Sequence, residues 1–208
     1  MKFDYNAIQT IATSIGTLFA GVIICFIVTK QKVSQYLETL AGSKVSSKVR
    51  GQSKVDLEIL ERMERIKELF NADRILVYEF HNGEHYANGR SALKLSCTYE
   101  VYKAGVKPIQ STRLGIPISC IPHHIAKVLD DTLTCVKDIE SIKEFMPSTY
   151  NLMTDNEAEA YTDMTLKNLD DEPVGFIEVQ WKDKDKFTKD DKELYRLAAY
   201  IEEKIINK

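Results

Sequence analysis

The densest group of side chains able to bind a polar ligand lies in the segment EFHNGEHYANGRS, residues 79–91. It contains His81, His85 and Tyr86 together with two Asn-Gly pairs. Asn-Gly pairs favour tight turns because both residues tolerate positive φ. The segment is therefore predicted to be a loop that turns twice between two strands and offers its imidazole, amide and phenol groups to a ligand.

The segment that follows the loop alternates polar and apolar residues, as in KLSCTYE at positions 94–100. Alternation puts every second side chain of a strand on the same face. We expect that polar face to line a cavity with the loop and to bind a small molecule or a regulatory protein, although a solvated strand face stays open as the alternative. The predicted ligand-binding residues are His81, Asn82, Gly83, Tyr86, Lys94, Ser96 and Glu100.

Catalytic and metal-binding patterns are weak in this sequence. His81 and His85 have the spacing of a helical metal-ligand pair, but the Asn-Gly pair between them argues against a helix. The four cysteines have no short paired spacing, and the adjacent His123 and His124 are expected to cap or pack. No nucleotide-binding or nucleophile motif is present. The protein is therefore expected to be non-enzymatic, without catalytic residues or a metal site, and the sequence indicates no particular cofactor.

The composition is that of a folded protein. The chain has 208 residues, of which 44% are hydrophobic and 28% charged, and a net charge of −3. A nucleic-acid-binding protein usually carries a basic patch, whereas the lysines here are scattered among acidic residues. Nucleic acid is therefore not expected as a partner.

An uncharged apolar run follows a short N-terminal tail, residues 1–7. Residues 8–28 contain no charge, and as a helix they rise about 32 Å, enough to cross a bilayer core of about 30 Å. A single transmembrane helix is predicted over residues 8–29, with a cleaved signal peptide as the alternative. Ala12, Gly16 and Ala20 recur at every fourth position, which favours close helix–helix contact and hence a homo-oligomer.

The residues after this run are basic. Residues 30–54 contain six Lys or Arg residues, among them Lys30, Lys32 and Lys44, and only one acid, Glu38. By the positive-inside rule, the protein is predicted to be a single-pass protein of the inner or plasma membrane with a cytoplasmic C-terminal domain. Residues 41–53 are rich in Gly, Ser and Lys. Residues 30–53 are predicted to be a basic flexible tether, followed by one domain over 54–208.

The order of elements in that domain predicts an α+β fold with helices packed on a central antiparallel sheet. An amphipathic helix should begin after Ser53, with a coiled coil between subunits as the alternative. Strands are predicted over 73–80, 91–101, 133–139, 159–169 and 172–181, a helix from Pro122, a helical or irregular stretch over 141–153, and a last helix opened by the capping pattern Thr188-x-x-Asp191.

Several segments resemble a GAF domain over about residues 54–207. They are ADRILVYEF after the first helix, RLGIPIS and VKDI around the middle helix, and the C-terminal segment from EPVGFIEVQW to the end, in which Gly175, Trp181, Phe187 and Thr188 match the family layout. The resemblance implies a regulatory module that binds a small ligand between the sheet and its covering helices, and that often dimerises. No chromophore-attachment or cyclic-nucleotide motif is matched, so the resemblance supplies no ligand.

The architecture also resembles the holin of T-even bacteriophages, in its single N-terminal span, charged tether and α+β domain containing G-x-I-x-x-x-W. That resemblance implies a lysis protein whose span oligomerises to permeabilise the membrane and whose domain binds an antiholin in the periplasm. The chain lacks the amphipathic segment that precedes the span in that family, and its charges favour the opposite orientation. A membrane-bound GAF-like regulatory protein is therefore the preferred prediction, and a holin the alternative.

Overall fold

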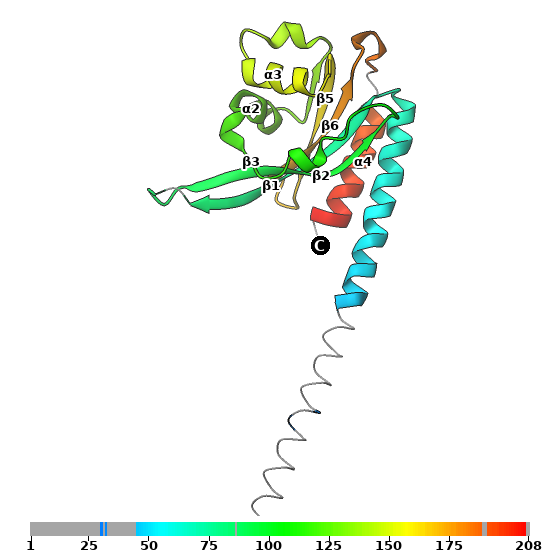
Figure 1. Ribbon diagram of the computed structural model, residues 1–208, viewed down its shortest axis with the longest axis vertical. Coiled ribbons are helices and arrows are strands. Elements are labelled where there is room, and N and C mark those ends of the chain that lie inside the picture. The colour runs from blue at the N-terminus through cyan, green and yellow to red at the C-terminus, as the bar shows by residue number, and fades with distance from the viewer. Residues whose placement is uncertain (1–29, 31, 33–44, 86, 189–190, 207–208) are drawn as a thin grey trace, which may run out of the picture. The chain divides into compact units, whose positions relative to one another are not determined.

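A computed structural model describes residues 30, 32, 45–85, 87–188 and 191–206 (Figure 1). The chain divides into two compact units, Met1–Lys54 and Val55–Lys208. The predicted transmembrane segment 8–29, with Ala12, Gly16 and Ala20, lies outside the described residues. Among the residues that are described, no helix has both the length and the apolar character needed to cross a membrane.

The described end of the first unit is helical. Residues 45–54 are all in a helix, so the prediction that helix begins only after Ser53 was wrong. The stretch contains no proline, and its one interior glycine, Gly51, costs a helix only about 1 kcal/mol relative to alanine. Whether residues 30–53 act as a flexible tether stays a prediction.

The second unit is built on a six-stranded sheet with the order β3-β2-β1-β6-β5-β4. Every neighbouring pair of strands is antiparallel, which confirms the predicted α+β class. The central strands β1 and β6 are neighbours in the sheet although they come from the start and the end of the domain. The strands are β1 Arg74–His85, β2 Ser91–Tyr102, β3 Ile116–Pro117, β4 Leu133–Val136, β5 Ala160–Lys167 and β6 Pro173–Trp181.

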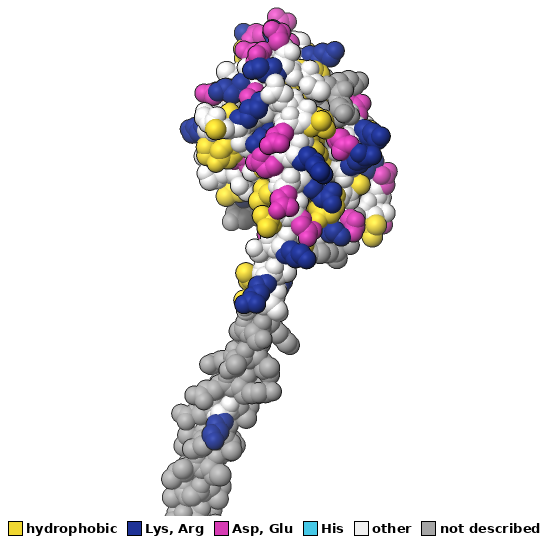
Figure 2. Space-filling model, turned by 90° about the vertical axis from the view of Figure 1, so that its right-hand side faces the viewer, with side chains coloured by type: hydrophobic (Ala, Val, Ile, Leu, Met, Phe, Trp, Pro, Cys, Tyr) yellow, Lys and Arg dark blue, Asp and Glu magenta, His cyan; other side chains and the backbone are white. Residues whose placement is uncertain are grey.

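One face of the sheet is apolar and is covered by two helices, residues 55–69 and α4, Asp191–Ile201. The helical residues Ile59, Met63 and Leu194 pack there against alternate strand residues such as Val77 and Ile177, and all five are buried. The predicted packing of an amphipathic helix on a sheet is thus confirmed. Figure 2 shows the exterior on this side, where acidic and basic side chains are intermixed over most of the surface.

The opposite face is covered by α2, Pro122–Asp130, and α3, Pro147–Asp155 (Figure 1). Helix α2 starts with a proline in its first turn, as predicted. Its buried residues Ile125 and Val128 join Leu76, Tyr78 and Phe176 of the sheet in a second core. Because both faces are covered, charged residues near the middle of the central strands, such as Asp163 and Glu178, are buried.

The hairpin of β1 and β2 is longer than predicted. β1 continues to His85, so most of the predicted loop 79–91 is strand. Gly83 lies in an irregular part of the pairing, where a Cβ atom would come within 2.2 Å of the Ala92 carbonyl oxygen. The pair Asn82-Gly83 therefore permits close strand approach and does not form a turn, while Gly89, with φ of 80°, belongs to the turn itself.

A β-bulge in this hairpin changes the face on which Glu100 lies. Val77 pairs with Tyr99, but the next residue, Tyr78, pairs with Cys97, so one residue of β2 is skipped. A bulge of this kind reverses the alternation beyond it. Glu100 is consequently on the face covered by α2 and α3, opposite to Lys94 and Ser96, which corrects the prediction that the three share a face.

Candidate functional site

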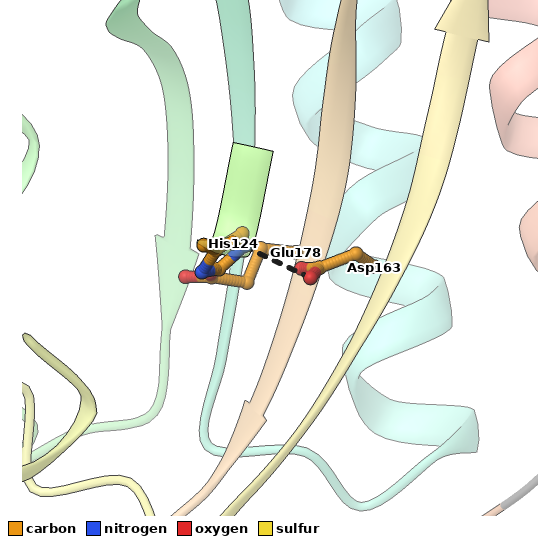
Figure 3. A group of neighbouring side chains, drawn as sticks. All are labelled: His124, Asp163 and Glu178. Atoms are coloured by element: carbon orange, nitrogen blue, oxygen red, sulfur yellow. Dashed lines mark ion pairs between the residues drawn. The ribbon is translucent and has the colours of Figure 1, made fainter. Parts of the chain in front are cut away.

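Three ionisable side chains meet beneath α2 (Figure 3). His124 comes from α2, Asp163 from β5 and Glu178 from β6, and their side chains are only 1–2% exposed. The His124 Nε2 atom lies 3.0 Å from Asp163 Oδ2 and 3.9 Å from Glu178 Oε2. We call this group the acidic triad.

The two carboxylates face each other because of strand register. Asp163 and Glu178 are direct partners across the β5–β6 ladder. Their neighbours Met164 and Ile177 point to the apolar face, so alternation directs both acids toward α2. Like charges directly opposite on neighbouring strands destabilise a sheet. Such an arrangement in a core therefore calls for a compensating positive charge.

Helix α2 brings the imidazole to these acids. The His124 ring lies between two aromatic rings, with centroid distances of 5.5 Å to both Tyr161 and Phe176. The end of the helix is tied to the sheet, since the Thr165 Oγ1 atom is 2.7 Å from the Val128 carbonyl oxygen. Packing and this polar contact thus hold the imidazole above the two acids.

Burial and mutual repulsion shift the proton affinities of the triad. Burial, and then the charge of Asp163, raises the pKa of Glu178 to about 7. Burial would lower the pKa of His124, but the carboxylates of Asp163 and Glu178 outweigh it, and the net shift is upward. Near neutral pH the triad therefore retains protons that exposed side chains of the same types would release.

Hydrogen bonding within the triad is incomplete. Gln180 Nε2 donates to Glu178 Oε1 at 2.6 Å. His124 Nε2 and Asp163 Oδ2 are paired with each other at 3.0 Å, whereas Asp163 Oδ1, His124 Nδ1 and the Tyr161 hydroxyl have no hydrogen-bond partner in the described part of the chain. Buried polar atoms are nearly always hydrogen-bonded in folded proteins. These atoms leave the triad with the capacity to bind a further partner, such as a proton, water or cation.

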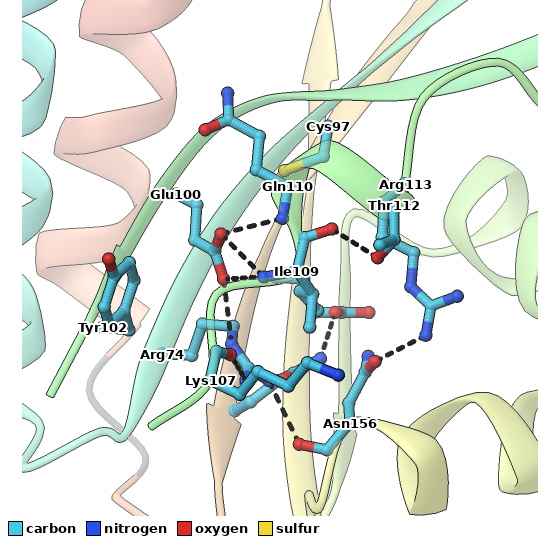
Figure 4. A network of polar contacts seen from close by, with 12 residues as sticks. Arg74, Cys97, Glu100, Tyr102, Lys107, Ile109, Gln110, Thr112, Arg113 and Asn156 are labelled. Carbon is cyan, nitrogen blue, oxygen red and sulfur yellow. Dashed lines mark hydrogen bonds and ion pairs between the residues drawn. The ribbon is translucent and has the colours of Figure 1, made fainter. Parts of the chain in front are cut away.

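A second polar cluster on the same face is balanced in charge (Figure 4). Arg74 Nε lies 3.1 Å from Glu100 Oε1, and both side chains are almost fully buried. Arg74 also donates to Gln180 Oε1 at 2.5 Å and to the Lys107 carbonyl oxygen at 2.7 Å. Glu100 accepts from the backbone amide of Ile109 at 3.0 Å. This Arg74–Glu100 cluster fixes the loop after β2 on the sheet, and Gln180 connects it to the triad.

Comparisons with known proteins identify the fold. No family model matches the sequence, and no curated protein matches it. Solved structures do match. The GAF3 domain of Slr1393 from Synechocystis sp. PCC6803, described in its photoproduct state, has a TM-score of 0.51 at 12% identity over 72% of this chain and 89% of that chain. The blue-light absorbing form of the PixJ GAF domain from Thermosynechococcus elongatus has a TM-score of 0.52 at 13% identity over 72% and 82%.

A third match is the chromophore-binding domain of the bacteriophytochrome RpBphP3 from R. palustris, with a TM-score of 0.51 at 12% identity over 77% of this chain and 60% of that chain. The fold is GAF-like. Identities this low establish the fold alone. None of these structures is described as a holin, so they give no support to that resemblance.

The GAF-like domain places the sequence-predicted site residues in three locations. His81, Lys94 and Ser96 come together on the outer part of the hairpin, with His81 Nε2 2.9 Å from Ser96 Oγ and His81 paired with Lys94. Asn82 and Gly83 follow on the same strand. Glu100 is separate, within the Arg74–Glu100 cluster, and Tyr86 lies outside the described residues. The hairpin residues stay a predicted binding site.

Sequence reasoning missed the acidic triad. Asp163 and Glu178 stand next to the apolar residues Met164 and Ile177 in strands that alternate polar and apolar residues, the usual pattern of a strand with one solvated face. His124 was expected only to cap or pack. The available signal was the GAF resemblance itself, since a sheet with helices on both faces buries these alternate positions as well.

Proposed function

We propose that this protein is a non-enzymatic, membrane-anchored regulatory protein whose GAF-like domain senses a ligand at the acidic triad. The observation that carries the proposal is the position of the triad, between the sheet and its covering helix α2, with some of its polar atoms unsatisfied. The resemblance to GAF domains implies a ligand bound between the sheet and its covering helices. Residues 8–29 would supply the anchor, and residues 30–53 the connection to it.

Sensing would act through α2. Asp163 and Glu178 on the sheet attract His124 of α2. Gain or loss of a positive charge within the triad changes the strength of that attraction. The state of the triad therefore alters how firmly α2 packs on the sheet. A change in the packing of α2 would alter how the GAF-like domains of two copies pair. The membrane anchors of the two copies would then move together or apart.

The test compares self-association of the full chain with and without an intact triad. Two copies carrying donor and acceptor fluorophores after Lys208 are expressed in bacterial membranes, and energy transfer is measured for wild type, Glu178→Gln and Glu157→Gln. Glu178 is in the triad, whereas Glu157 is an exposed acid paired with Lys182. Glu178→Gln is expected to change energy transfer at least twofold, and Glu157→Gln to behave as wild type.

Equal energy transfer in all three proteins would show that the triad does not regulate association. A second measurement checks the anchor separately, because a reporter with distinct cytoplasmic and periplasmic signals can be placed after Lys208. A cytoplasmic signal from membrane fractions supports the proposed arrangement. A soluble chain would rule out the membrane anchor, and a periplasmic signal would reverse the predicted orientation.

A further inference from the structure

We propose that the acidic triad is a binding site for a single divalent transition-metal ion, held by His124, Asp163 and Glu178. The inference rests on the proposed function, in that the ion would be the ligand that the domain senses. Three separate features support it: the geometry of the ligand atoms, the charge of the cluster and the orientation of Glu178.

The three side chains supply ligand atoms at suitable separations. One nitrogen from His124 and one oxygen from each acid all lie within 4.8 Å of one another. Bonds of about 2.0–2.2 Å separate neighbouring ligands of a tetrahedral ion by roughly 3.3–3.6 Å. The observed distances of 3.0 Å and 3.9 Å from Nε2 bracket this value. Small side-chain rotations therefore bring three ligands around one ion.

The charge of the cluster favours a cation. Two carboxylates share the site with one imidazole, whereas Arg74, the buried cation on the same face, is already paired with Glu100. Ionised carboxylates are costly to bury unless they are paired, and an ion bound to both acids would provide that pairing. It would also give a partner to Asp163 Oδ1, which has no hydrogen bond in the described structure, or take the place of the contact between Asp163 Oδ2 and His124 Nε2.

Glu178 is oriented by a hydrogen bond from a neighbouring side chain, as the carboxylate ligands of metal ions commonly are. Gln180 donates to one oxygen of Glu178 and leaves Oε2, the oxygen nearer His124, available to bind. Hydrogen bonds of this kind orient ligand carboxylates. One nitrogen and two oxygen ligands suit Zn²⁺, Fe²⁺ or Mn²⁺, and without sulfur they disfavour Cu⁺.

Burial restricts the size of the occupant. The triad is covered by α2 and flanked by the rings of Tyr161 and Phe176, so its side chains are at most 2% exposed. A single ion fits among such side chains, whereas an organic ligand would require α2 to move. Because entry requires opening of the domain or folding around the ion, binding is measured after refolding as well as after prolonged incubation.

The experiment measures zinc bound by the full chain, purified in detergent, stripped with a chelator and refolded with Zn²⁺. Wild type is expected to retain one ion per chain. His124→Gln, Asp163→Asn and Glu178→Gln are expected to weaken binding by at least 100-fold. His123→Gln is the matched control, because His123 is the exposed neighbour of His124 on the same helix, and it is expected to bind as wild type.

Two results would overturn the metal site: absence of bound zinc in wild type, or equal loss in the His123 and His124 variants. Since a triad variant could fail to fold, X-ray absorption of zinc-loaded wild type gives an independent test. Nitrogen and oxygen ligands with one imidazole are expected, and a sulfur ligand would place the ion at a cysteine and contradict the proposal.

Failure of the metal site is distinguishable from failure of the proposed function. If zinc does not bind but Glu178→Gln still changes energy transfer between copies, the regulatory proposal stands and the metal assignment is wrong. If zinc binds the triad but energy transfer responds neither to zinc nor to Glu178→Gln, the site is metal-binding and the regulatory proposal is wrong.

Discussion

The two polar clusters beneath α2 and α3 are buried to the same degree but differ in how their charges are matched. The Arg74–Glu100 cluster pairs one cation with one anion and adds backbone partners to both. The acidic triad sets two anions against one imidazole, so the second anion has no cation of its own. The first has the features of a structural cluster, whereas the second retains binding capacity that the chain itself does not use.

The largest effect is expected from breaking the balanced cluster. Arg74→Leu leaves Glu100 buried without its partner, and loss of one member of a buried pair costs about 3–5 kcal/mol. Urea unfolding of the full chain, followed by fluorescence of Trp181, the single and fully buried tryptophan, measures the change.

Asp171→Asn is the control for this prediction. It removes an ion pair with Lys167 in which the aspartate side chain is 83% exposed, and exposed pairs contribute at most about 1 kcal/mol. If Arg74→Leu destabilised the domain no more than Asp171→Asn, the Arg74–Glu100 cluster would not be the structural cluster inferred above.

The next largest effect concerns the pH dependence of the metal-free protein. The pKa of Glu178 is raised to about 7 by burial and by Asp163, so the folded state keeps a proton that the unfolded chain releases above its ordinary carboxyl pKa. Stability from this group is full in acid and is lost as pH rises to about 7, by about 3 kcal/mol in total. The raised pKa of His124 acts in the same direction.

Glu178→Gln isolates this contribution because glutamine mimics the protonated acid. In chelator the variant is expected to match wild type at pH 4 and to exceed it by about 3 kcal/mol at pH 8. Arg74 contacts Gln180, which in turn contacts Glu178, and Tyr161 lies against His124. Arg74 and Tyr161 are therefore not mutated in this comparison. Parallel stability curves for the two proteins between pH 4 and 8 would contradict the assignment.

A smaller effect is expected where α2 is tied to the sheet. Thr165→Val keeps the shape of the side chain but removes the contact with the Val128 and Asp131 carbonyl oxygens, which costs about 1–2 kcal/mol. Hydrogen exchange should rise in α2 more than in α4, which packs on the other face. Equal exchange in both helices would show that this contact does not hold α2 in place.

The smallest effect is expected at the neighbour of the triad. His123 is exposed on α2, so His123→Gln should alter the free energy of unfolding by no more than about 0.5 kcal/mol. Its pH dependence should also match that of wild type. A larger effect would mean that the solvent side of α2 contributes to the behaviour assigned here to the buried side.

Local patterns predicted much of the fold. The period of Ile59, Met63 and Ile66 identified the first helix of the domain, and Pro122 marked the start of α2. The final hairpin was predicted from alternation in β5 and β6. These features depend on neighbouring residues alone, which is why periodicity reveals them.

The site could not be predicted in the same way. Asp163 and Glu178 meet only because β5 pairs with β6 in a particular register, and His124 joins them only because α2 lies over that register. The β-bulge that moves Glu100 to the other face is likewise set by pairing between strands. Such features depend on tertiary contacts, which residue spacing alone does not determine.

The placement of the cysteines has a practical consequence for measuring movement of α2. Cys97 is buried in the second core and Cys135 is partly covered, whereas Cys120 is exposed two residues before Pro122. Burial raises the pKa of the Cys97 thiol and suppresses its thiolate. Among these three cysteines, a maleimide dye would therefore label Cys120 first and place a fluorescent probe at the start of the helix that covers the triad.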